Sequence, residues 1–232
     1  MVGSGAVIWD FDRTLARRAT GWSGMLLALL NREEPAHGVE LSVLMGYMVG
    51  IWPWDRPERE HPELADPADW WADLVPRMAS ALRSSGAPGR LAEKVAAAAA
   101  VEYSRPEHWS AVPDAAEVLR LVRDMGWRNA ILSNHCPELP QIVRSVGLAD
   151  HVDCVLTSAA IGVEKPHRKA FEVALQRLGN PTQVWMVGDS LEADVEGAGR
   201  AGIPAVLVHG EAPGVLCAPD LATAIRLIAR RL

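Results

Sequence analysis

Acidic, amide and hydroxyl side chains directly follow three short apolar runs of the sequence, at residues 6–9, 130–132 and 184–188. Such runs predict strands of a parallel sheet, and ligands bind beyond the carboxyl ends of such strands. The polar side chains should therefore meet at one edge of the sheet. They are Asp10, Asp12, Ser133, Asn134, Asp189 and Asp194.

Carboxylates gathered in one crevice repel one another, and without a cation at least one of them would take up a proton. A divalent cation relieves this repulsion. Mg²⁺ prefers oxygen ligands and is usually held by one or two carboxylates together with water and substrate phosphate. Asp10 and Asp189, on separate predicted strands, suit this pattern. We therefore predict a Mg²⁺ site.

From about residue 106 the chain alternates short apolar runs with helical segments, which is typical of βαβ units around a parallel sheet. We predict an α/β fold whose core is a Rossmann-like, doubly wound parallel sheet. The predicted strands are 6–9, 129–132, 152–157, 184–187 and 205–208. The predicted helices are 114–125, 137–146, 168–178, 191–201 and 220–231.

Residues 17–105 contain no convincing strand pattern, and we predict an all-helical insertion there. The α/β core domain is accordingly placed at residues 1–16 and 106–232. Apolar side chains recur every four residues within 67–84, which predicts a buried stripe, and Pro76 should kink that helix. The predicted helices are 22–31, 39–50, 67–84 and 90–103, and the stripe is Trp70, Leu74, Met78 and Leu82.

Charge and cysteine content argue against several classes of protein. A net charge of −6 over 232 residues, without a block of Lys or Arg, disfavours a nucleic-acid or anionic-membrane surface. The apolar stretches fall short of the ~20 residues of a membrane span, and the first residues lack a secretory-signal pattern. Cys136, Cys154 and Cys217 form no closely spaced framework, so we expect free thiols and a cytoplasmic protein.

Four short motifs, in order along the chain, carry a resemblance to a known family. They are DFDRTL at 10–15, ILSN at 131–134, Lys165–Pro166 within GVEKPHRKAF, and GDSLEAD at 188–194. The chain resembles the haloacid dehalogenase superfamily, in its phosphatase-like branch, over residues 5–16 and 106–210. The helical insertion at 17–105 stands where this family places a mobile cap domain.

The resemblance implies a role for each acidic residue. Asp10 would be the nucleophile that forms an aspartyl-phosphate, and Asp12 the general acid and base. The implied metal ligands are Asp10, the backbone carbonyl of Asp12, and Asp189. Asp194 would bind a metal-bound water or orient Lys165. Without the resemblance, each carboxylate could instead cap a turn or lie in solvent.

The remaining motif residues are implied to contact the phosphoryl group. Ser133 would donate a hydroxyl hydrogen bond to it, and Lys165 would place an ammonium between the nucleophile and the phosphoryl oxygens. Asn134 would either fix the loop or reach the substrate, and Thr14 would mainly hold the loop, with a smaller direct role. Lys165 stands out because lysine is only three of the 23 basic residues.

One residue within the first motif and one residue beside the second motif have no settled role. Arg13 departs from the family pattern, in which a small residue, usually glycine, stands there, and we expect it to point to solvent. His135 adjoins Asn134 and could approach the substrate, although a lone histidine is more often structural.

The predicted function is a Mg²⁺-dependent phosphatase that hydrolyses a small phosphorylated metabolite. Asp12 argues against dehalogenation, because a leaving halide needs no proton and the family's dehalogenases lack this aspartate. The alternatives are a phosphoryl mutase, a phosphonate hydrolase using a cap lysine, for which Lys94 is the only candidate, and a non-catalytic binding module. We expect a monomer or a homodimer, with no nucleic-acid or membrane partner.

The cap should determine which substrate is accepted. Five of the nine tryptophans lie in it, and they favour either core packing or an aromatic pocket. Arg17 and Arg18 could contact a second anionic group, but surface placement is expected. The five tryptophans are Trp22, Trp52, Trp54, Trp70 and Trp71.

Overall fold

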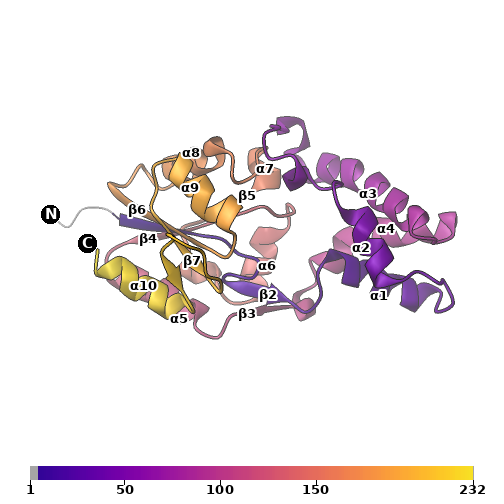
Figure 1. Cartoon of the computed structure of the whole chain (residues 1–232), viewed down its shortest axis with the longest axis horizontal. Helices are drawn as coiled ribbons and strands as arrows, with labels where there is room; N and C mark the ends of the chain where they lie inside the picture. The colour runs from indigo at the N-terminus through magenta and orange to yellow at the C-terminus, as the bar shows by residue number, and fades with distance from the viewer. Residues whose placement is uncertain (1–4, 232) are drawn as a thin grey trace.

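The computed structural model describes residues 5–231 and consists of an α/β lobe and a helical lobe that lie end to end (Figure 1). The α/β lobe contains both ends of the described chain. The helical lobe is formed by the segment between the first strand and residue 105. The residues that the sequence analysis predicts for the site lie on the α/β lobe, on the side that faces the helical lobe.

Within residues 5–231 the α/β lobe holds a six-stranded sheet of order β5-β4-β1-β6-β7-β8. Every neighbouring pair in it is parallel. The first strand therefore lies in the interior, between the second and fourth strands of the core, as a doubly wound sheet requires. The strands are β1 (Gly5–Trp9), β4 (Arg128–Ser133), β5 (Cys154–Thr157), β6 (Gln183–Gly188), β7 (Ala205–Val208) and β8 (Cys217–Ala218).

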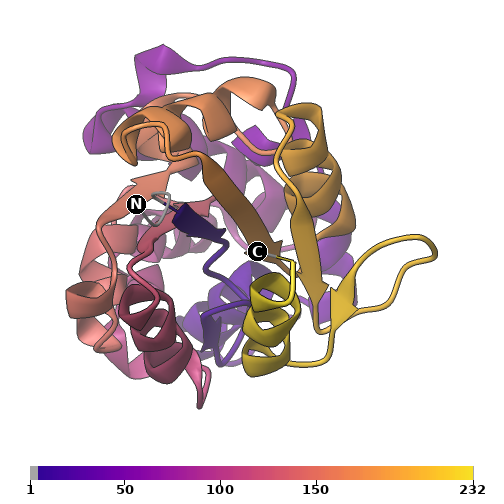
Figure 2. The ribbon, with the colours of Figure 1, turned by 90° about the vertical axis from the view of Figure 1, so that its left-hand side faces the viewer.

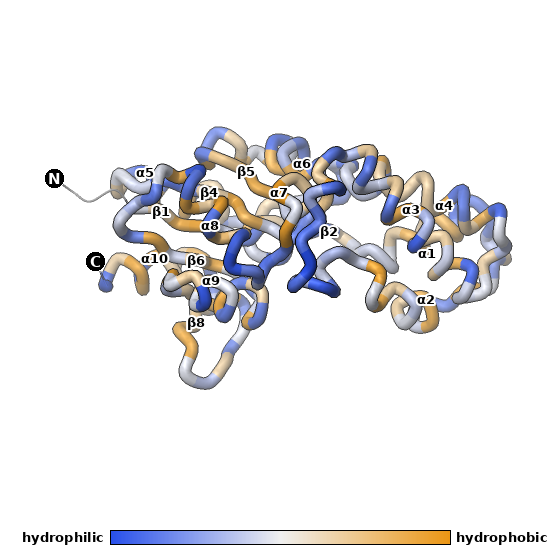
Figure 3. Tube along the Cα trace, turned by 90° about the horizontal axis from the view of Figure 1, so that it is seen from above, coloured by the Kyte–Doolittle hydropathy of each residue, from blue (hydrophilic) through white to orange (hydrophobic). Residues whose placement is uncertain are grey.

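The two faces of the sheet pack against different helices. Val7 and Trp9 of β1 belong to the apolar cluster on one face, and Ala6 and Ile8 to the cluster on the other, because strand side chains alternate. Figure 2 shows α5 and α10 on one side of the sheet and α8 and α9 on the other. The strands are largely in the hydrophobic colour in Figure 3, as expected for a sheet covered on both faces. The core helices are α5 (Ala115–Asp124), α6 (Leu139–Ser145), α7 (Ser158–Ile161), α8 (Arg168–Arg177), α9 (Gly197–Arg200) and α10 (Leu221–Ala229).

The predicted α/β fold is confirmed, and three local predictions need correction. The segment predicted as one helix over 191–201 is the π-helix η5 (Leu191–Glu196) followed by α9. The short helix α7 and the two-residue strand β8 were not predicted, because segments of four and two residues are too short to show a period. Two 3₁₀ turns complete the core, η3 (Pro106–His108) and η4 (Ala149–His151).

The helical lobe is a bundle whose helices bury one apolar face each. The predicted stripe of α3 is confirmed, since Trp70, Leu74, Met78 and Leu82 are all buried. Helix α3 continues past Pro76, begins at an Asp66 side chain that accepts the N–H of Ala68, and packs on α4. The elements are α1 (Trp22–Glu33), α2 (Leu41–Met48), η1 (Pro53–Asp55), η2 (Pro62–Leu64), α3 (Pro67–Ser84) and α4 (Gly89–Tyr103).

A small antiparallel ladder connects the two lobes. Strand β2 (Ala16–Arg18) pairs with β3 (Trp109–Ala111), so the chain leaves and re-enters the α/β lobe at adjacent points. The prediction of a strand-free segment over 17–105 was wrong at its first two residues. The ladder is only three residues long and pairs distant segments, so local sequence carries no sign of it. The domain limits stay a prediction.

The three cysteines form no disulfide within residues 5–231. Cys136, Cys154 and Cys217 are free thiols, and Cys136 is buried. Across residues 5–231, no helix has the length and apolar content to cross a bilayer.

Shortening a buried side chain of the α3 stripe should destabilise the helical lobe. Leu74 is 0% exposed, and we expect Leu74→Ala to lower the free energy of unfolding by about 2–5 kcal/mol through lost burial and a cavity. Val101→Ala on α4, where the side chain is 66% exposed, is the matched control and should stay within about 0.5 kcal/mol of wild type. Urea denaturation followed by far-UV circular dichroism measures both changes. Equal losses would contradict the packing described.

Candidate active site

The carboxyl end of β1 places Asp10 at the centre of the site. β1 is buried along its whole length and pairs with β4 and β6 on either side. The Asp10 N–H donates to the carbonyl of Val187 at 2.9 Å, which extends the ladder by one residue. Asp10 is 6% exposed, so its carboxylate is held in a fixed place at the edge of the sheet.

Lys165 is a buried ammonium that contacts two of the predicted carboxylates. Its Nζ lies 2.8 Å from Asp10 Oδ1 and 2.6 Å from Asp194 Oδ1. Burial disfavours the charged amine, but the two carboxylates outweigh it and raise the pKa of Lys165. Lys165 is therefore a permanent cation at the base of the site.

Burial and, after it, repulsion between neighbouring acids raise the pKa values of the other carboxylates. Burial, together with the nearby Asp10 and Asp189, raises the pKa of Asp12 to about 7. Burial also raises the pKa of Asp194 to about 6, with Lys165 opposing the change. The pKa of Asp189 is raised by burial and then by Asp10. Lys165 alone thus does not balance this group of acids.

Carboxylate oxygens of Asp10, Asp189 and Asp194 lie within 4.8 Å of one another, as a shared cation would require. The Asp12 side chain is not part of this group, so the structure does not bring its carboxylate to the predicted metal site. Hard carboxylate oxygens suit Mg²⁺, and burial together with the nearby Asp10 raises the pKa of both Asp189 and Asp194. The donor set therefore fits the predicted ion.

The loop after β6 holds Asp194 in place. Ser190 caps η5, since its hydroxyl accepts the N–H of Ala193 at 3.1 Å. Asp194 is 1% exposed, and its Oδ2 accepts the N–H of Ser190 at 3.0 Å. With Oδ1 on Lys165, both oxygens of Asp194 are engaged. Asp194 thus contacts Lys165 directly, and its predicted role in orienting that lysine stays a prediction.

Ser133 and Asn134, at the end of β4, reach the same place by different contacts. The hydroxyl of Ser133 donates to Asp10 Oδ1 at 3.0 Å. The Asn134 amide donates to the carbonyl of Lys165 at 2.8 Å and accepts the Lys165 N–H at 2.7 Å. Asn134 therefore fixes the lysine loop. Its binding to phosphate, like that of Ser133, stays a prediction.

Within the first motif, Arg13 is largely exposed and Thr14 is fully buried. The Arg13 side chain is 78% exposed, as expected, yet its Nε lies 3.2 Å from Asp189 Oδ2. Its backbone φ of 67° explains why glycine would suit this position. Thr14 is fully buried, its hydroxyl has no partner within residues 5–231, and it does not line the cavity. The structure thus does not bring Thr14 to the cavity.

A cavity of about 340 Å³ opens over these residues. The core lines it with the acidic cluster, Lys165, Ser133, Asn134, Arg13 and His135, and the cap with aromatic side chains. The sequence makes Trp22 and Trp54 candidates for an aromatic pocket, but it does not single out Tyr103. The only available signal for Tyr103 was its place at the end of the last cap helix, just before the chain returns to the core. The cap residues lining the cavity are Trp22, Trp54 and Tyr103.

The cap is docked onto the lysine loop through a buried contact that the sequence did not indicate. His61 Nε2 lies 3.0 Å from Glu164 Oε1, with both side chains almost fully buried, and the His61 N–H donates to the carbonyl of Gly162 at 2.8 Å. Glu164 directly precedes Lys165. Cap docking and the position of the catalytic-site amine therefore share one segment.

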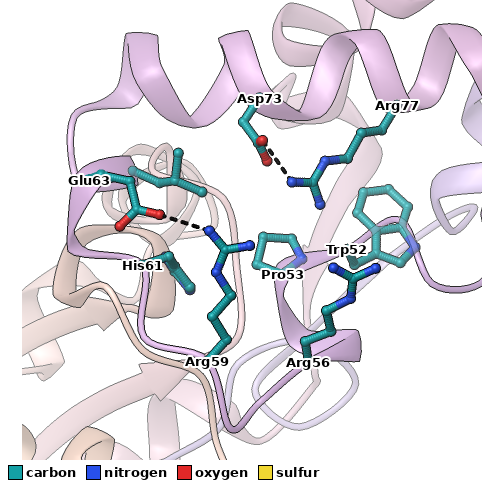
Figure 4. A pocket seen from close by; sticks show the side chains of 9 residues that line it. Trp52, Pro53, Arg56, Arg59, His61, Glu63, Asp73 and Arg77 are labelled. Atoms are coloured by element: carbon teal, nitrogen blue, oxygen red, sulfur yellow. Dashed lines mark hydrogen bonds and ion pairs between the residues drawn. The ribbon is translucent and has the colours of Figure 1, made fainter.

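His61 also borders a second pocket, of about 160 Å³, between the cap loop and α3 (Figure 4). Arginine side chains point into it, and two of them pair with acids, Arg59 with Glu63 and Arg77 with Asp73. None of the predicted site residues lines this pocket. The chemistry therefore belongs to the larger cavity.

Comparison with known proteins agrees with this geometry. The model of the haloacid dehalogenase-like hydrolase family matches residues 5–202. The chain belongs to this family. The resemblance to this family that the four motifs carry is thus confirmed.

Curated relatives match over part of their length. The chain is 35% identical to haloacid dehalogenase-like hydrolase domain-containing protein 3 of Mus musculus over 146 residues, which cover 62% of this chain and 57% of the relative. It is 42% identical to ribulose-1,5-bisphosphate 5-phosphatase of Halopiger xanaduensis over 104 residues, 44% of this chain and 43% of the relative. The chain thus spans about half the length of the curated relatives it matches.

Solved structures share the fold along nearly the whole chain. A 2-haloacid dehalogenase from Pseudomonas syringae is 21% identical with a TM-score of 0.70, covering 99% of this chain and 100% of that one. A phosphatase of the family from Thermococcus onnurineus is 20% identical with a TM-score of 0.60, covering 97% of each chain. At these identities the likeness shows the fold alone.

Adding a methyl group at Gly188 should displace the Asp194 side chain that packs against it. A Cβ there would lie 2.1 Å from Asp194 Oδ2, whereas one at Gly199 would meet nothing within 4 Å. We expect Gly188→Ala to lower the free energy of unfolding by about 1–3 kcal/mol, since the crowded Asp194 must shift. Gly199→Ala, the control in α9, should be neutral or stabilising by up to about 1 kcal/mol. Urea titration of both variants tests this, and a neutral Gly188→Ala would contradict the tight packing.

His135 should make stability depend on pH. Burial lowers its pKa to about 4 from 6.5, so between these values the unfolded chain holds a proton that the folded one lacks. Stability is therefore lost as pH falls below 6.5. Relative to His135→Phe, the wild type should lose about 2 kcal/mol of unfolding free energy between pH 7.5 and pH 5.0. Urea titrations at the two pH values measure this, and a constant difference would refute it.

Proposed function

We propose that this protein is a Mg²⁺-dependent phosphatase that hydrolyses the phosphate ester of a small metabolite through an aspartyl-phosphate on Asp10. The observation that carries the proposal is the state of the Asp10 carboxylate. Its Oδ1 accepts bonds from the Lys165 ammonium and the Ser133 hydroxyl, while Oδ2 accepts none from the described residues. One oxygen is anchored and the other is available to attack phosphorus.

Asp12 supplies the proton that an ester needs. It stands two residues after Asp10, lines the same cavity, and has a pKa raised to about 7 by burial and by Asp10 and Asp189. A carboxyl group that holds its proton near neutral pH can donate it to the leaving alkoxide. It can then take a proton from the water that hydrolyses the aspartyl-phosphate, which restores both aspartates.

Fixed positive charge stabilises the transferring phosphoryl group. Lys165 is buried beside Asp10 and keeps its proton. The Ser133 hydroxyl lines the cavity beside it. Mg²⁺, when bound by Asp10, Asp189 and Asp194, would neutralise their charge and polarise the phosphoryl oxygens.

The proposal favours phosphate esters over the other substrates that the family suggests. Lys94, the candidate for a phosphonate-cleaving Schiff base, is 64% exposed, pairs with Glu33 and does not line the cavity. Dehalogenation needs no acid at Asp12. The similarity to a phosphatase at 42% identity supports the same reaction class.

Removing the nucleophile should abolish phosphate release. We expect wild-type protein with Mg²⁺ to release phosphate from a panel of metabolite phosphates, and Asp10→Asn or excess EDTA to lower the rate at least about 10³-fold. Asp124→Asn, which removes a 61% exposed carboxylate of α5, is the matched control and should keep the wild-type rate. A malachite-green assay measures the released phosphate.

Other outcomes would replace this function. Halide release from 2-chloropropionate without phosphate release would show a dehalogenase. Phosphate transfer between two sugar positions without net release would show a mutase. Folded protein that binds Mg²⁺ and acts on none of these compounds would show a binding module.

A further inference from the structure

The cap contributes only aromatic side chains to the active-site cavity. Within the described part of the chain, Trp22, Trp54 and Tyr103 line it from the cap, and no Lys or Arg between residues 19 and 105 does. The cationic side chains of the lining, Lys165 and Arg13, come from the core, and each contacts a carboxylate of the site. The part of a substrate that faces the cap therefore meets ring surfaces and no counter-ion for a second anionic group.

Tyr103 and Trp22 have their ring faces engaged with neighbouring side chains. Their rings stack on each other with centroids 3.5 Å apart and planes 7° apart. The Arg18 guanidinium lies over the Tyr103 ring at 5.0 Å, and Trp52 packs against Trp22 at 4.7 Å. These two residues form a wall of the cavity rather than a surface for stacking.

Trp54 differs from them because it is stacked on a single ring. The Trp52 ring is parallel to it at 5.0 Å, and no other ring contact of Trp54 occurs within residues 5–231. Trp54 lines the cavity and is half-buried. No other ring of the described residues covers its second face, which makes this face the candidate apolar surface that the cap offers a ligand.

The surroundings of Trp54 hold it in place before any ligand binds. Trp54 lies in η1, where the Trp52 N–H donates to Asp55 Oδ2 at 3.1 Å and Pro53 occupies the first position. Trp52 in turn packs on Trp22, which is fixed by its stack on Tyr103. A fixed platform loses little conformational entropy on binding, so stacking on it contributes its full stabilisation.

We propose that Trp54 is a stacking platform for a planar ring in the leaving group, so that the substrate is a monophosphate ester carrying a nucleobase or an aryl ring. The proposal rests on the proposed phosphatase function and names its substrate class. The products are phosphate and the ring-bearing alcohol, whose oxygen takes the proton of Asp12. Aliphatic phosphates lack a ring that could stack on Trp54, and the second anionic group of a bisphosphate would meet no cationic side chain from the cap.

Two pairs of phosphate esters, each with and without a planar ring, measure what the ring contributes to the reaction beyond the phosphate. Uridine 5′-monophosphate is compared with ribose 5-phosphate, and benzyl phosphate with cyclohexylmethyl phosphate, by kcat/KM for phosphate release with Mg²⁺. We expect the ring ester to be favoured about 10-fold to 100-fold in at least one pair, as base stacking on an aromatic side chain contributes. The first pair reports a nucleobase and the second a simple aryl ring.

Variants assign the preference to Trp54. Trp54→Ala should reduce the ratio within the favoured pair to near one, and Trp54→Phe, which keeps a ring face, should retain most of it. Tyr47→Ala removes an aromatic side chain of α2 that is 49% exposed and outside the cavity, and should leave the ratio unchanged. A ratio near one for both pairs in the wild type, or a ratio that Trp54→Ala does not change, overturns the proposal.

Loss of the phosphatase function itself has a separate signature. If the wild type releases phosphate from the panel of metabolite phosphates but from none of the four esters, the platform proposal is overturned. If it releases phosphate from neither the panel nor the four esters, the phosphatase function fails. Equilibrium dialysis of the same esters with wild type and Trp54→Ala then tests the platform by binding. The proposal is supported if a ring ester binds at least tenfold more tightly than its ringless partner and Trp54→Ala removes the difference. Equal binding of the two esters within each pair overturns it.

Discussion

The buried ammonium of Lys165 is the interaction on which the site depends. It contacts Asp10 and Asp194, and all three side chains are less than a tenth exposed. A carboxylate buried without a partner would cost several kcal/mol, and so would an unpaired ammonium, so each group needs the others. Because Asp10 follows β1, Asp194 lies in η5 and Lys165 precedes α8, the contact needs the tertiary structure that brings these three segments together.

The loop around Lys165 also contacts the cap. Asn134 bonds both backbone groups of Lys165, while the preceding Glu164 contacts His61 and Gly162 accepts the His61 N–H. A further contact joins the cap to the core where Trp71 Nε1 donates to Glu138 Oε1 at 2.9 Å. The cap is therefore held near the catalytic groups by polar contacts that are themselves largely buried, and its aromatic wall is placed relative to Asp10.

The two sides of the cavity differ in the chemistry of the side chains that line them. The core side carries crowded carboxylates with raised pKa values, which is a suitable environment for a divalent cation and for proton transfer at Asp12. The cap side carries stacked rings and no cation among its lining residues. Under the proposed function, charge would bind the phosphate end of a ligand and apolar surface would contact the other end.

The sequence alone determined the α/β class, the helical insertion and the acidic edge, because apolar runs and the polar residues that follow them are local patterns. Asp10, Asp189 and Lys165 could be named from their place after predicted strands and from their motifs. The tertiary structure decided the rest. It turned Asn134 toward the Lys165 backbone, buried Thr14 away from the cavity, and paired His61 with Glu164. These are contacts between residues 31 to 103 positions apart, or the outcome of packing around one residue, and no local period records them.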